Sequence, residues 1–349
     1  MSKDMPDALN FAIVGAGAIA RQHVKAILNH PAAKLVAVSS RDLTPIDVLL
    51  GDSSYVGKYL DYREMLLRSD IDVVCICTPS GTHSEIAIAC AEAGKHVLCE
   101  KPLDIREDRM SAMIKACRSH GVKLGCVFQR RLMPAAQHTQ EALQAGKLGR
   151  LLIGNAFLKY YRSPEYYDSG SWRGTWELDG GGALMNQGIH GVDLLQYLLG
   201  DVESVFAYSD TLIHRISVED TSVVALKFRS GAFGVIQATT SVYPGQETRF
   251  ELHGDKGTVE FGDEGFRQWV FRDYPESVPF IADTLGLSVS SDPQQLSFAG
   301  HYYYIDDMIQ AIHEGREPAV NGEEARKSVD LILACYESAR TGKEVKLPV

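Results

Sequence analysis

The sequence predicts two domains, a doubly wound α/β domain followed by an α+β domain with a large open, mainly antiparallel β-sheet. In the first part of the chain, short apolar runs alternate with amphipathic helical segments, a rhythm typical of a parallel sheet covered on both faces. After about residue 128, apolar and polar residues alternate over long segments, as in an antiparallel sheet with one open face. We therefore place the first domain at residues 1–128 and the second at 129–349.

The expected elements of the first domain follow one another with short connections. The strands are 10–15, 34–39, 72–78, 97–99 and 123–128, and the helices are 19–29, 83–93 and 106–120, with a weaker helical and loop region that includes 62–68. Gly94 and Gly121 follow two of these helices, where glycine commonly ends a helix.

The second domain begins with a linking helix at 133–144. Period-two alternation then marks strands within 151–162, 202–213, 221–231, 232–243 and 248–261, and two helices, 302–313 and 323–339, close the chain.

Composition limits the partners and the compartment. The net charge of −10 argues against nucleic acid or an anionic membrane as the main partner. The polar N-terminus shows no signal peptide and no apolar run is long enough to cross a membrane, so we expect a cytoplasmic protein. The seven cysteines lack paired CxxC spacing and are predicted to be small buried hydrophobic residues rather than disulfides or zinc ligands.

A glycine-rich turn lies between the first strand and the first helix. It fits G-x-G-x-x-A, from Gly15 through Gly17, Ala18 and Ile19 to Ala20. The first glycine permits the tight turn, the second lets the backbone approach a pyrophosphate, and the small last residue lets helix and strand pack closely. In the first βα unit of this alternating pattern, the turn predicts a dinucleotide-binding Rossmann domain. The alternative is a turn without a ligand.

The end of the second strand bears on the cofactor. NAD-binding Rossmann domains usually have an acidic residue at this position, which binds the ribose 2′-hydroxyl. This chain has Ser39, Ser40 and Arg41, whose hydroxyls and guanidinium suit a 2′-phosphate, followed by Asp42, which could pair with Arg41. NADP is therefore favoured over NAD. Alternatively, Arg41 is a solvated loop residue.

Further cofactor contacts are expected where strands end, because these positions face the ligand crevice of a doubly wound sheet. Thr78 and Pro79 follow the third strand, His83 opens the next helix, and Gln129 follows the last strand of the domain. For His83, the alternative is an ordinary residue at a helix N-terminus.

The tripeptide Glu100-Lys101-Pro102 follows an apolar strand in the same domain. A lysine beside a bound nicotinamide could donate a proton or a hydrogen bond to a substrate oxygen during hydride transfer, and the proline would fix the local backbone. Lys101 is the best catalytic candidate and a substrate contact, and Glu100 and Lys101 both adjoin the expected cofactor.

A second dense segment runs from Asp179 to Asp193 and contains three glycines at 180–182. On a helix, Asn186 and His190 are four residues apart and share a face. A histidine with a pKa near neutrality suits the removal of a hydroxyl proton. The glycines would let the helix start flush against another surface or a ligand. The alternative for His190 is a hydrogen-bonded core histidine. No metal is expected, because an HExxH motif is missing and an amide occupies the place of a carboxylate.

Together these residues resemble the Gfo/Idh/MocA oxidoreductase family, which includes glucose–fructose oxidoreductase and inositol dehydrogenase. The resemblance extends from about residue 9 to the end and rests on GAGAIA at 15–20, TPSGTH at 78–83, AGKHVLCEKP at 93–102 and GGGALMNQGIHGVDLL at 180–195.

This resemblance implies a Rossmann domain followed by an open mixed β-sheet with helices. It also implies that Lys101 is the catalytic lysine, that the bond before Pro102 is cis, and that His190 is the catalytic histidine. Inositol dehydrogenase-like members have aspartate where this chain has Asn186. An amide can orient hydroxyls but cannot ionise, and it favours the branch that acts on nucleotide-linked or otherwise modified sugars.

Four side chains of the second domain are candidate substrate contacts: Arg131, Arg162, Trp172 and Trp176. Aromatic faces suit the C–H side of a sugar ring, and guanidinium groups suit carboxylate or phosphate. The alternatives are internal ion pairs for the arginines and core packing for the tryptophans. The sequence does not place His301, which could also contribute.

We therefore expect an NAD(P)-dependent sugar dehydrogenase or reductase. His190 would remove a proton from a ring hydroxyl, Lys101 would bind the same oxygen, and Asn186 would position the ring. The alternatives are a glycoside hydrolase that uses transient oxidation by tightly bound NAD, and a non-catalytic NADP-binding regulator. The open sheet and the resemblance imply a homodimer or homotetramer.

Overall fold

The computed structural model describes residues 7–51, 53–275, 277–279 and 298–348. The chain forms two compact units. The first contains the described residues up to Val127 together with 298–326, and the second contains residues from Phe128 to 279 together with 327–348. The division differs from the one expected, because the segment 298–326 belongs to the first unit.

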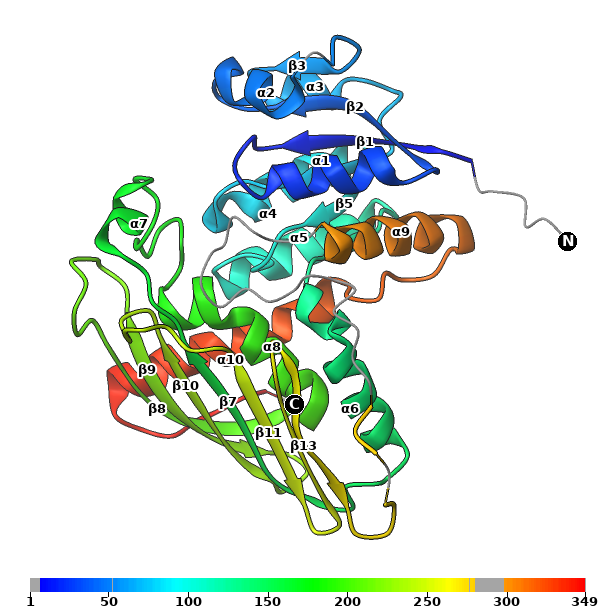
Figure 1. Ribbon diagram of the computed structural model, residues 1–349. Helices are drawn as coiled ribbons and strands as arrows, with labels where there is room; N and C mark the ends of the chain where they lie inside the picture. The colour runs from blue at the N-terminus through cyan, green and yellow to red at the C-terminus, as the bar shows by residue number, and fades with distance from the viewer. Residues whose placement is uncertain (1–6, 52, 276, 280–297, 349) are drawn as a thin grey trace, which may run out of the picture. The chain divides into compact units, whose positions relative to one another are not determined.

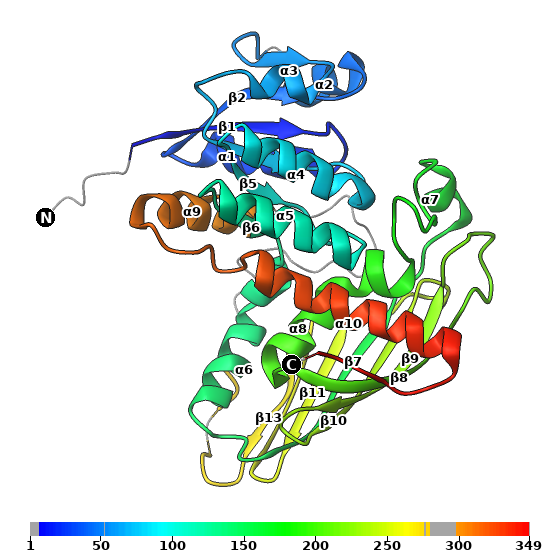
Figure 2. The same ribbon diagram turned by 180° about the vertical axis from the view of Figure 1, so that it is seen from behind.

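The first unit contains a six-stranded parallel sheet with the order β3-β2-β1-β4-β5-β6. Its strands are β1 (Leu9–Val14), β2 (Ala33–Ser39), β3 (Gly57–Tyr59), β4 (Val73–Ile76), β5 (His96–Cys99) and β6 (Leu124–Cys126). Its helices are α1 (Ala20–Asn29), α2 (Leu43–Leu50), α3 (Tyr62–Leu66), the 3-10 turn η1 (Ser80–Thr82), α4 (His83–Glu92), α5 (Glu107–Ser119) and α9 (Ala299–Glu314). Helices α1 and α9 cover one face of the sheet (Figure 1), and α4 and α5 cover the other (Figure 2).

Burial explains why these residues form strands. All four residues of β4 are buried, as are most residues of β1 and β5, because helices cover both faces of the sheet. The sequence pattern missed β3, which is only three residues long and has no fully buried position. Helix α9 joins this unit because it packs against α1, β5 and β6.

The second unit contains an eight-stranded sheet with the order β13-β12-β11-β7-β10-β9-β8-β14, in which β7 and β10 pair in parallel and the other pairs are antiparallel. Its strands are β7 (Leu151–Lys159), β8 (Val202–Asp210), β9 (Thr221–Phe228), β10 (Phe233–Thr239), β11 (Arg249–Gly254), β12 (Gly257–Gly262), β13 (Gly265–Phe271) and β14 (Val345–Lys346). Its helices are the 3-10 turn η2 (Gln129–Leu132), α6 (Pro134–Gln144), α7 (Pro164–Asp168), the π-helical turn η3 (Ala183–Gly188), α8 (Ile189–Leu199) and most of α10 (Gly322–Thr341).

One face of this sheet is packed and the other is open. Helices lie against the packed face (Figure 2), and β9 alternates strictly between buried and exposed residues along its length. The expected open, mainly antiparallel sheet is therefore confirmed. The sequence pattern missed β13 and β14, which lie at the two edges of the sheet.

The cysteine prediction is also confirmed. All seven cysteines are buried and have free thiols. Burial raises the pKa of the Cys77 and Cys99 thiols well above the usual value, so these groups stay protonated and pack as apolar side chains. In the described part of the chain, no helix is long and apolar enough to cross a membrane.

Candidate active site

The glycine-rich turn joins β1 to α1. Gly15 has a φ of 98°, and a Cβ atom there would lie 2.6 Å from the carbonyl oxygen of Cys77, so both the backbone conformation and the neighbouring strand require glycine. Gly17 differs, because a Cβ there would meet no protein atom within 4 Å. Protein packing therefore does not require this second glycine, which stands where a dinucleotide-binding turn lets the backbone approach a pyrophosphate. Ala18 is exposed and Ile19 half-buried at the start of α1.

The loop after β2 carries an exposed guanidinium. Arg41 is exposed and Ser40 half-buried, and within the described ranges no acid pairs with Arg41. Asp42 caps helix α2 instead, by accepting a 2.9 Å hydrogen bond from the backbone N–H of Thr44. The pairing of Asp42 with Arg41 considered from the sequence is therefore absent, and the guanidinium stays available to a ligand.

His83 is buried and ties two loops of the first unit together. Its Nδ1 atom lies 2.8 Å from the carbonyl oxygen of Pro102, and its Nε2 atom lies 3.0 Å from that of Thr78. The loop containing Thr78 and Pro79 is thereby linked to the turn that carries Lys101. Because protein carbonyls occupy both ring nitrogens, His83 holds these two loops together.

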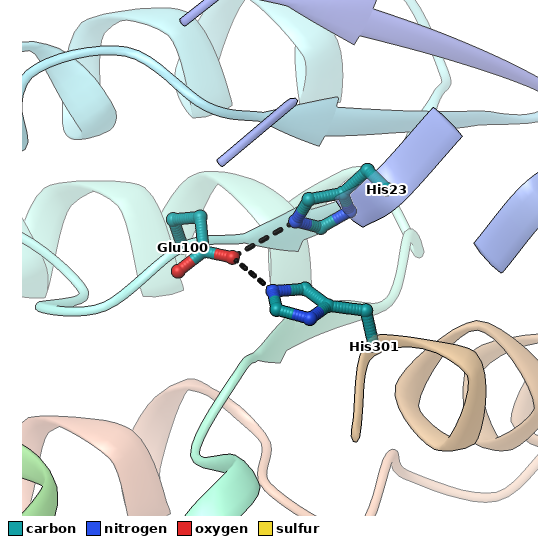
Figure 3. Close-up of side chains that lie close together, drawn as sticks. All are labelled: His23, Glu100 and His301. Carbon is teal, nitrogen blue, oxygen red and sulfur yellow. Dashed lines mark hydrogen bonds and ion pairs between the residues drawn. The ribbon is translucent and has the colours of Figure 1, made fainter. Parts of the chain in front are cut away.

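Glu100 lies at the centre of a buried cluster (Figure 3). Its Oε1 atom accepts hydrogen bonds from Nε2 of His23 on α1, at 2.9 Å, and from Nε2 of His301 on α9, at 3.0 Å. All three side chains are buried. Burial alone would raise the pKa of Glu100, but the hydrogen bonds from the two histidines outweigh it and hold that pKa well below its usual range. Burial lowers the pKa of His23, which favours a neutral imidazole.

The same three residues could in principle hold a metal ion, because their ligand atoms lie within 4.8 Å of one another. A histidine that binds a metal usually donates its second N–H to a protein acceptor. Here the Nδ1 atoms of His23 and His301 are buried without a hydrogen-bond partner among the described residues. The distances, and the Nδ1 atoms that have no hydrogen-bond partner among the described residues, fit two histidines that donate from Nε2 to one carboxylate, and this cluster fixes the backbone directly before Lys101.

Lys101 follows this cluster directly and is half-buried. The peptide bond between Lys101 and Pro102 is cis, as expected. The backbone N–H of Lys101 donates to the second carboxylate oxygen of Glu100, at 3.3 Å. The lysine therefore follows a strand end whose position is set by buried contacts.

In the second unit, Asn186 lies in the π-helical turn η3, which leads directly into α8 and His190. The expected helix is present, but its first turn is wider, with a 3.1 Å bond from Gln187 N to the carbonyl oxygen of Gly182. The amide nitrogen and the amide oxygen of the Asn186 side chain are both hydrogen-bonded. Its amide donates to the buried Asp179, and its oxygen accepts a 2.8 Å bond from Gln187 Nε2.

Asp179 supplies a carboxylate that sequence reasoning did not assign to the site. Its Oδ2 atom also accepts a 2.8 Å hydrogen bond from Gly174 N, so the side chain is anchored independently of Asn186. Position 186 therefore has no acid of its own, but the Asn186 amide is hydrogen-bonded to one, the carboxylate of Asp179. The position of Asp179, immediately before the three glycines, was the only signal for it in the sequence.

The glycines before η3 let the backbone pack directly against polar groups of Tyr336 and Glu219. This confirms the expectation that the helix starts flush against another surface. A Cβ at Gly181 would collide with the hydroxyl of Tyr336, and one at Gly182 would collide with the backbone of Glu219. The buried Glu219 carboxylate accepts hydrogen bonds from Gly182 N, Leu184 N and the Tyr336 hydroxyl, at 2.9, 2.8 and 2.8 Å. Burial outweighs these bonds and raises the pKa of Glu219 to about 7.

His190 is half-buried on the first turn of α8. Its ring makes an edge-to-face contact with Phe128, with the ring centroids 5.8 Å apart. The side chain is therefore packed on one side and partly accessible to solvent.

Arg131 forms an internal ion pair. Its Nε and Nη2 atoms bind both carboxylate oxygens of Asp193, at 2.8 and 2.6 Å, and both side chains are almost fully buried. The guanidinium also stacks on Tyr197, 4.5 Å from the ring centroid. The structure therefore supports the internal ion pair, the alternative stated for Arg131, and it places Asp193 in that pair.

The other candidates of the second unit differ in exposure. Arg162 is buried and binds Gln187, whose side chain also bonds to Asn186. Trp176 is 45% exposed, so it is not a core residue, and its Nε1 donates to Ser217 O. Trp172 is half-buried, and Gln129 is buried on η2.

Two family models match the chain, one described as an oxidoreductase family with an NAD-binding Rossmann fold, over residues 9–128, and one described as a GFO/IDH/MocA C-terminal domain, over residues 136–260. The structure of the WlbA dehydrogenase from Bordetella pertussis, in complex with NADH and UDP-GlcNAcA, is 36% identical. The match covers 98% of this chain and 99% of that one, with a TM-score of 0.87. The chain belongs to the Gfo/Idh/MocA oxidoreductase family.

Two further relatives are sugar or inositol dehydrogenases. The myo-inositol 2-dehydrogenase of Thermotoga maritima is 27% identical over 97% of this chain and 98% of its own. A levoglucosan dehydrogenase, solved with NADH and levoglucosan, is 25% identical, with a TM-score of 0.85 over 98% of this chain and all of that one. The Gfo/Idh/MocA protein is therefore an oxidoreductase with an NAD-binding Rossmann domain, and the predicted family, fold class and enzymatic nature are confirmed.

Proposed function

We propose that the enzyme transfers hydride between a nicotinamide cofactor and a ring carbon of a sugar or sugar derivative, nucleotide-linked sugars included. The observation that carries this proposal is the fixed amide of Asn186, held by Asp179 and Gln187 one turn ahead of His190. An amide fixed on both atoms offers hydrogen bonds of defined direction to a substrate hydroxyl. The UDP-GlcNAcA bound by the 36% identical Bordetella dehydrogenase supports a nucleotide-linked sugar.

Three side chains have proposed roles in this reaction. In oxidation, His190 accepts the proton of the ring hydroxyl, and Lys101 binds that same oxygen and stabilises the charge that develops on it. A nicotinamide cofactor would supply the hydride acceptor in this direction. Asn186 orients the ring, with Asp179 behind it. In the reverse direction, the same groups protonate the oxygen of a keto-sugar.

For the cofactor, we propose that NADP is preferred over NAD. Arg41 is exposed and unpaired among the described residues, and the following acid is engaged in capping α2. A free guanidinium at the end of β2 suits a 2′-phosphate. The relatives solved with NADH show that the family fold accepts the unphosphorylated cofactor as well.

We further propose a homodimer or homotetramer that covers the open sheet face. The strand registers place four exposed apolar side chains on that face: Ile153, Tyr208, Val223 and Phe233. Apolar side chains gathered on one sheet face favour contact with a second copy. Light scattering at micromolar concentration tests this, and a monomeric mass would contradict it.

The proposed activity is tested with a panel of sugars and sugar nucleotides, assayed by the absorbance of the reduced cofactor with NAD and with NADP. For the substrate found, Lys101→Ala and His190→Ala are each expected to lower kcat by about 10²–10⁴-fold, the usual contribution of a positioned acid or base. Lys115→Ala, at an exposed position of α5, is the matched control. Unchanged turnover in Lys101→Ala would show that the assigned lysine is wrong.

A further inference from the structure

Two guanidinium groups of the second unit lie against one tyrosine ring. The Arg162 guanidinium is 5.6 Å and that of Arg173 is 4.3 Å from the centroid of the Tyr166 ring. Nη1 of Arg173 also donates a 2.6 Å hydrogen bond to the Tyr166 hydroxyl. The sequence motifs of the family resemblance do not include Arg173.

Neither arginine has an acidic partner within the described ranges. Arg162 is 7% exposed and donates only to neutral acceptors, from Nε to Gln187 and from Nη1 to the carbonyl oxygen of Tyr161. Its Nη2 atom has no hydrogen-bond partner among the described residues. Arg173 donates to the Tyr166 and Ser169 hydroxyls only.

This arrangement contrasts with the other buried arginines of the unit. Arg130 and Arg131 are each paired with a buried aspartate, Asp263 and Asp193. Burial of a guanidinium without a counter-charge is costly, and two like charges beside one ring add repulsion. An anion supplied from outside the chain would remove both costs.

We propose that Arg162 and Arg173 form a subsite for a carboxylate carried by the sugar ring of the substrate. This inference rests on the proposed function and names the substrate class as uronates. The planar fork of a guanidinium matches a carboxylate bidentately. Arg162 binds Gln187, which binds Asn186, the residue that orients the reacting ring. A group held at Arg162 therefore belongs to that ring rather than to a distant diphosphate.

The test compares two pairs of sugars that differ only at C6. The first pair is UDP-GlcNAcA and its counterpart with a hydroxymethyl group in place of the carboxylate. The second pair is free glucuronate and glucose, which lack the diphosphate. Initial rates are followed by cofactor absorbance, and binding of each sugar to the enzyme–NADH complex is followed by calorimetry.

The wild-type enzyme is expected to prefer the uronate of at least one pair. Arg162→Gln and Arg173→Gln are each expected to weaken uronate binding by about tenfold or more, the loss that corresponds to one charge-assisted hydrogen bond. Binding of the neutral counterpart should change little. Arg162→Lys keeps the positive charge but lacks the planar guanidinium that binds a carboxylate bidentately. It replaces Arg162→Gln in the test if that variant does not fold. Arg229→Gln, at an exposed arginine of the same unit, is the control.

The outcomes separate the two proposals. If no sugar is oxidised, the proposed function fails and the uronate subsite fails with it. If neutral sugars are oxidised and bound as well as uronates, or if the arginine variants weaken both members of a pair equally, only the subsite is overturned. The arginine variants could instead weaken the binding of both UDP-linked sugars and of neither free sugar. That result would assign the arginines to the diphosphate and also overturn the carboxylate proposal.

Discussion

The hydroxyl of Tyr336 on α10 donates a 2.8 Å hydrogen bond to the Oε1 atom of the buried Glu219. The same carboxylate accepts from the backbone N–H groups of Gly182 and Leu184. One acid therefore holds the start of the turn that carries Asn186. Burial raises the pKa of the Tyr336 hydroxyl well above its usual value, so it remains a donor over the whole physiological pH range.

Glu219 is predicted to make stability depend on pH. With a pKa raised to about 7 from 4.5, the folded protein keeps this proton at pH values where the unfolded chain has lost it. The stabilisation is complete below the unfolded pKa and is lost as pH rises through the folded one, by roughly 3 kcal/mol for this single group. Urea unfolding at pH 5 and pH 8 measures it. Glu219→Gln should flatten the pH dependence, whereas the exposed Glu337→Gln should not.

The Asn186–Asp179 contact predicts that an acid is poorly tolerated at position 186. Asn186→Asp would replace the donor to Asp179 with a second carboxylate, and two acids at this distance cannot both ionise at low cost. We expect the free energy of unfolding to fall by about 1–3 kcal/mol at pH 8 and by less at pH 5. Asn29→Asp, at an exposed site, is the control. Equal stability of Asn186→Asp and wild type at pH 8 would contradict the contact.

The Arg131–Asp193 pair is predicted to serve stability rather than substrate binding. Arg131→Leu removes the guanidinium that binds both oxygens of the buried Asp193 carboxylate, and the expected cost is about 3–5 kcal/mol. The double variant Arg131→Leu/Asp193→Leu should recover much of this loss, because it removes both charges. Denaturant unfolding gives both values. A normally stable Arg131→Leu enzyme with a greatly raised KM for sugar would instead favour substrate binding.

Arg41 is predicted to set the preference between the two cofactors. Arg41→Ala should lower kcat/KM with NADP by about tenfold or more, the value of a hydrogen bond to a charged group, and leave kcat/KM with NAD nearly unchanged. Steady-state kinetics with both cofactors measures the ratio. Arg21→Ala on α1 is a control for general loss of charge in the first unit. An equal fall with both cofactors would refute a contact with the 2′-phosphate.

The fold was largely predictable because its signals are local. Burial on both faces leaves continuous apolar runs such as β4, and one open face leaves the alternation seen in β9. Short edge strands such as β3 carry too few residues to produce either pattern. The assignment of α9 to the first unit depends on packing between distant segments, which a periodic pattern does not record.

Candidate site residues that lie inside motifs could be named from the sequence, whereas their hydrogen-bond partners could not. Lys101, Asn186 and His190 stand in dense, unusual segments. The contacts of His301 with Glu100 and of Glu219 with Gly182 join positions far apart in the chain, and only the folded structure brings them together. For Arg131 the sequence could not distinguish two roles, because an arginine in a loop after a strand looks the same whether it binds a ligand or pairs with Asp193.

The late return of the chain in α9 has a consequence for biosynthesis. The His301 side chain bonds to Glu100 across a sequence separation of 201 residues, and α9 packs against α1, the first helix of the described residues. A ribosome-bound chain that has emerged only as far as residue 128 therefore lacks one of the two histidines that donate to the Glu100 carboxylate and one of the helices that cover the sheet. The nucleotide-binding unit starts first and is completed only after most of the second unit has been translated, so it is not a self-contained module that can be cut out or exchanged at residue 128.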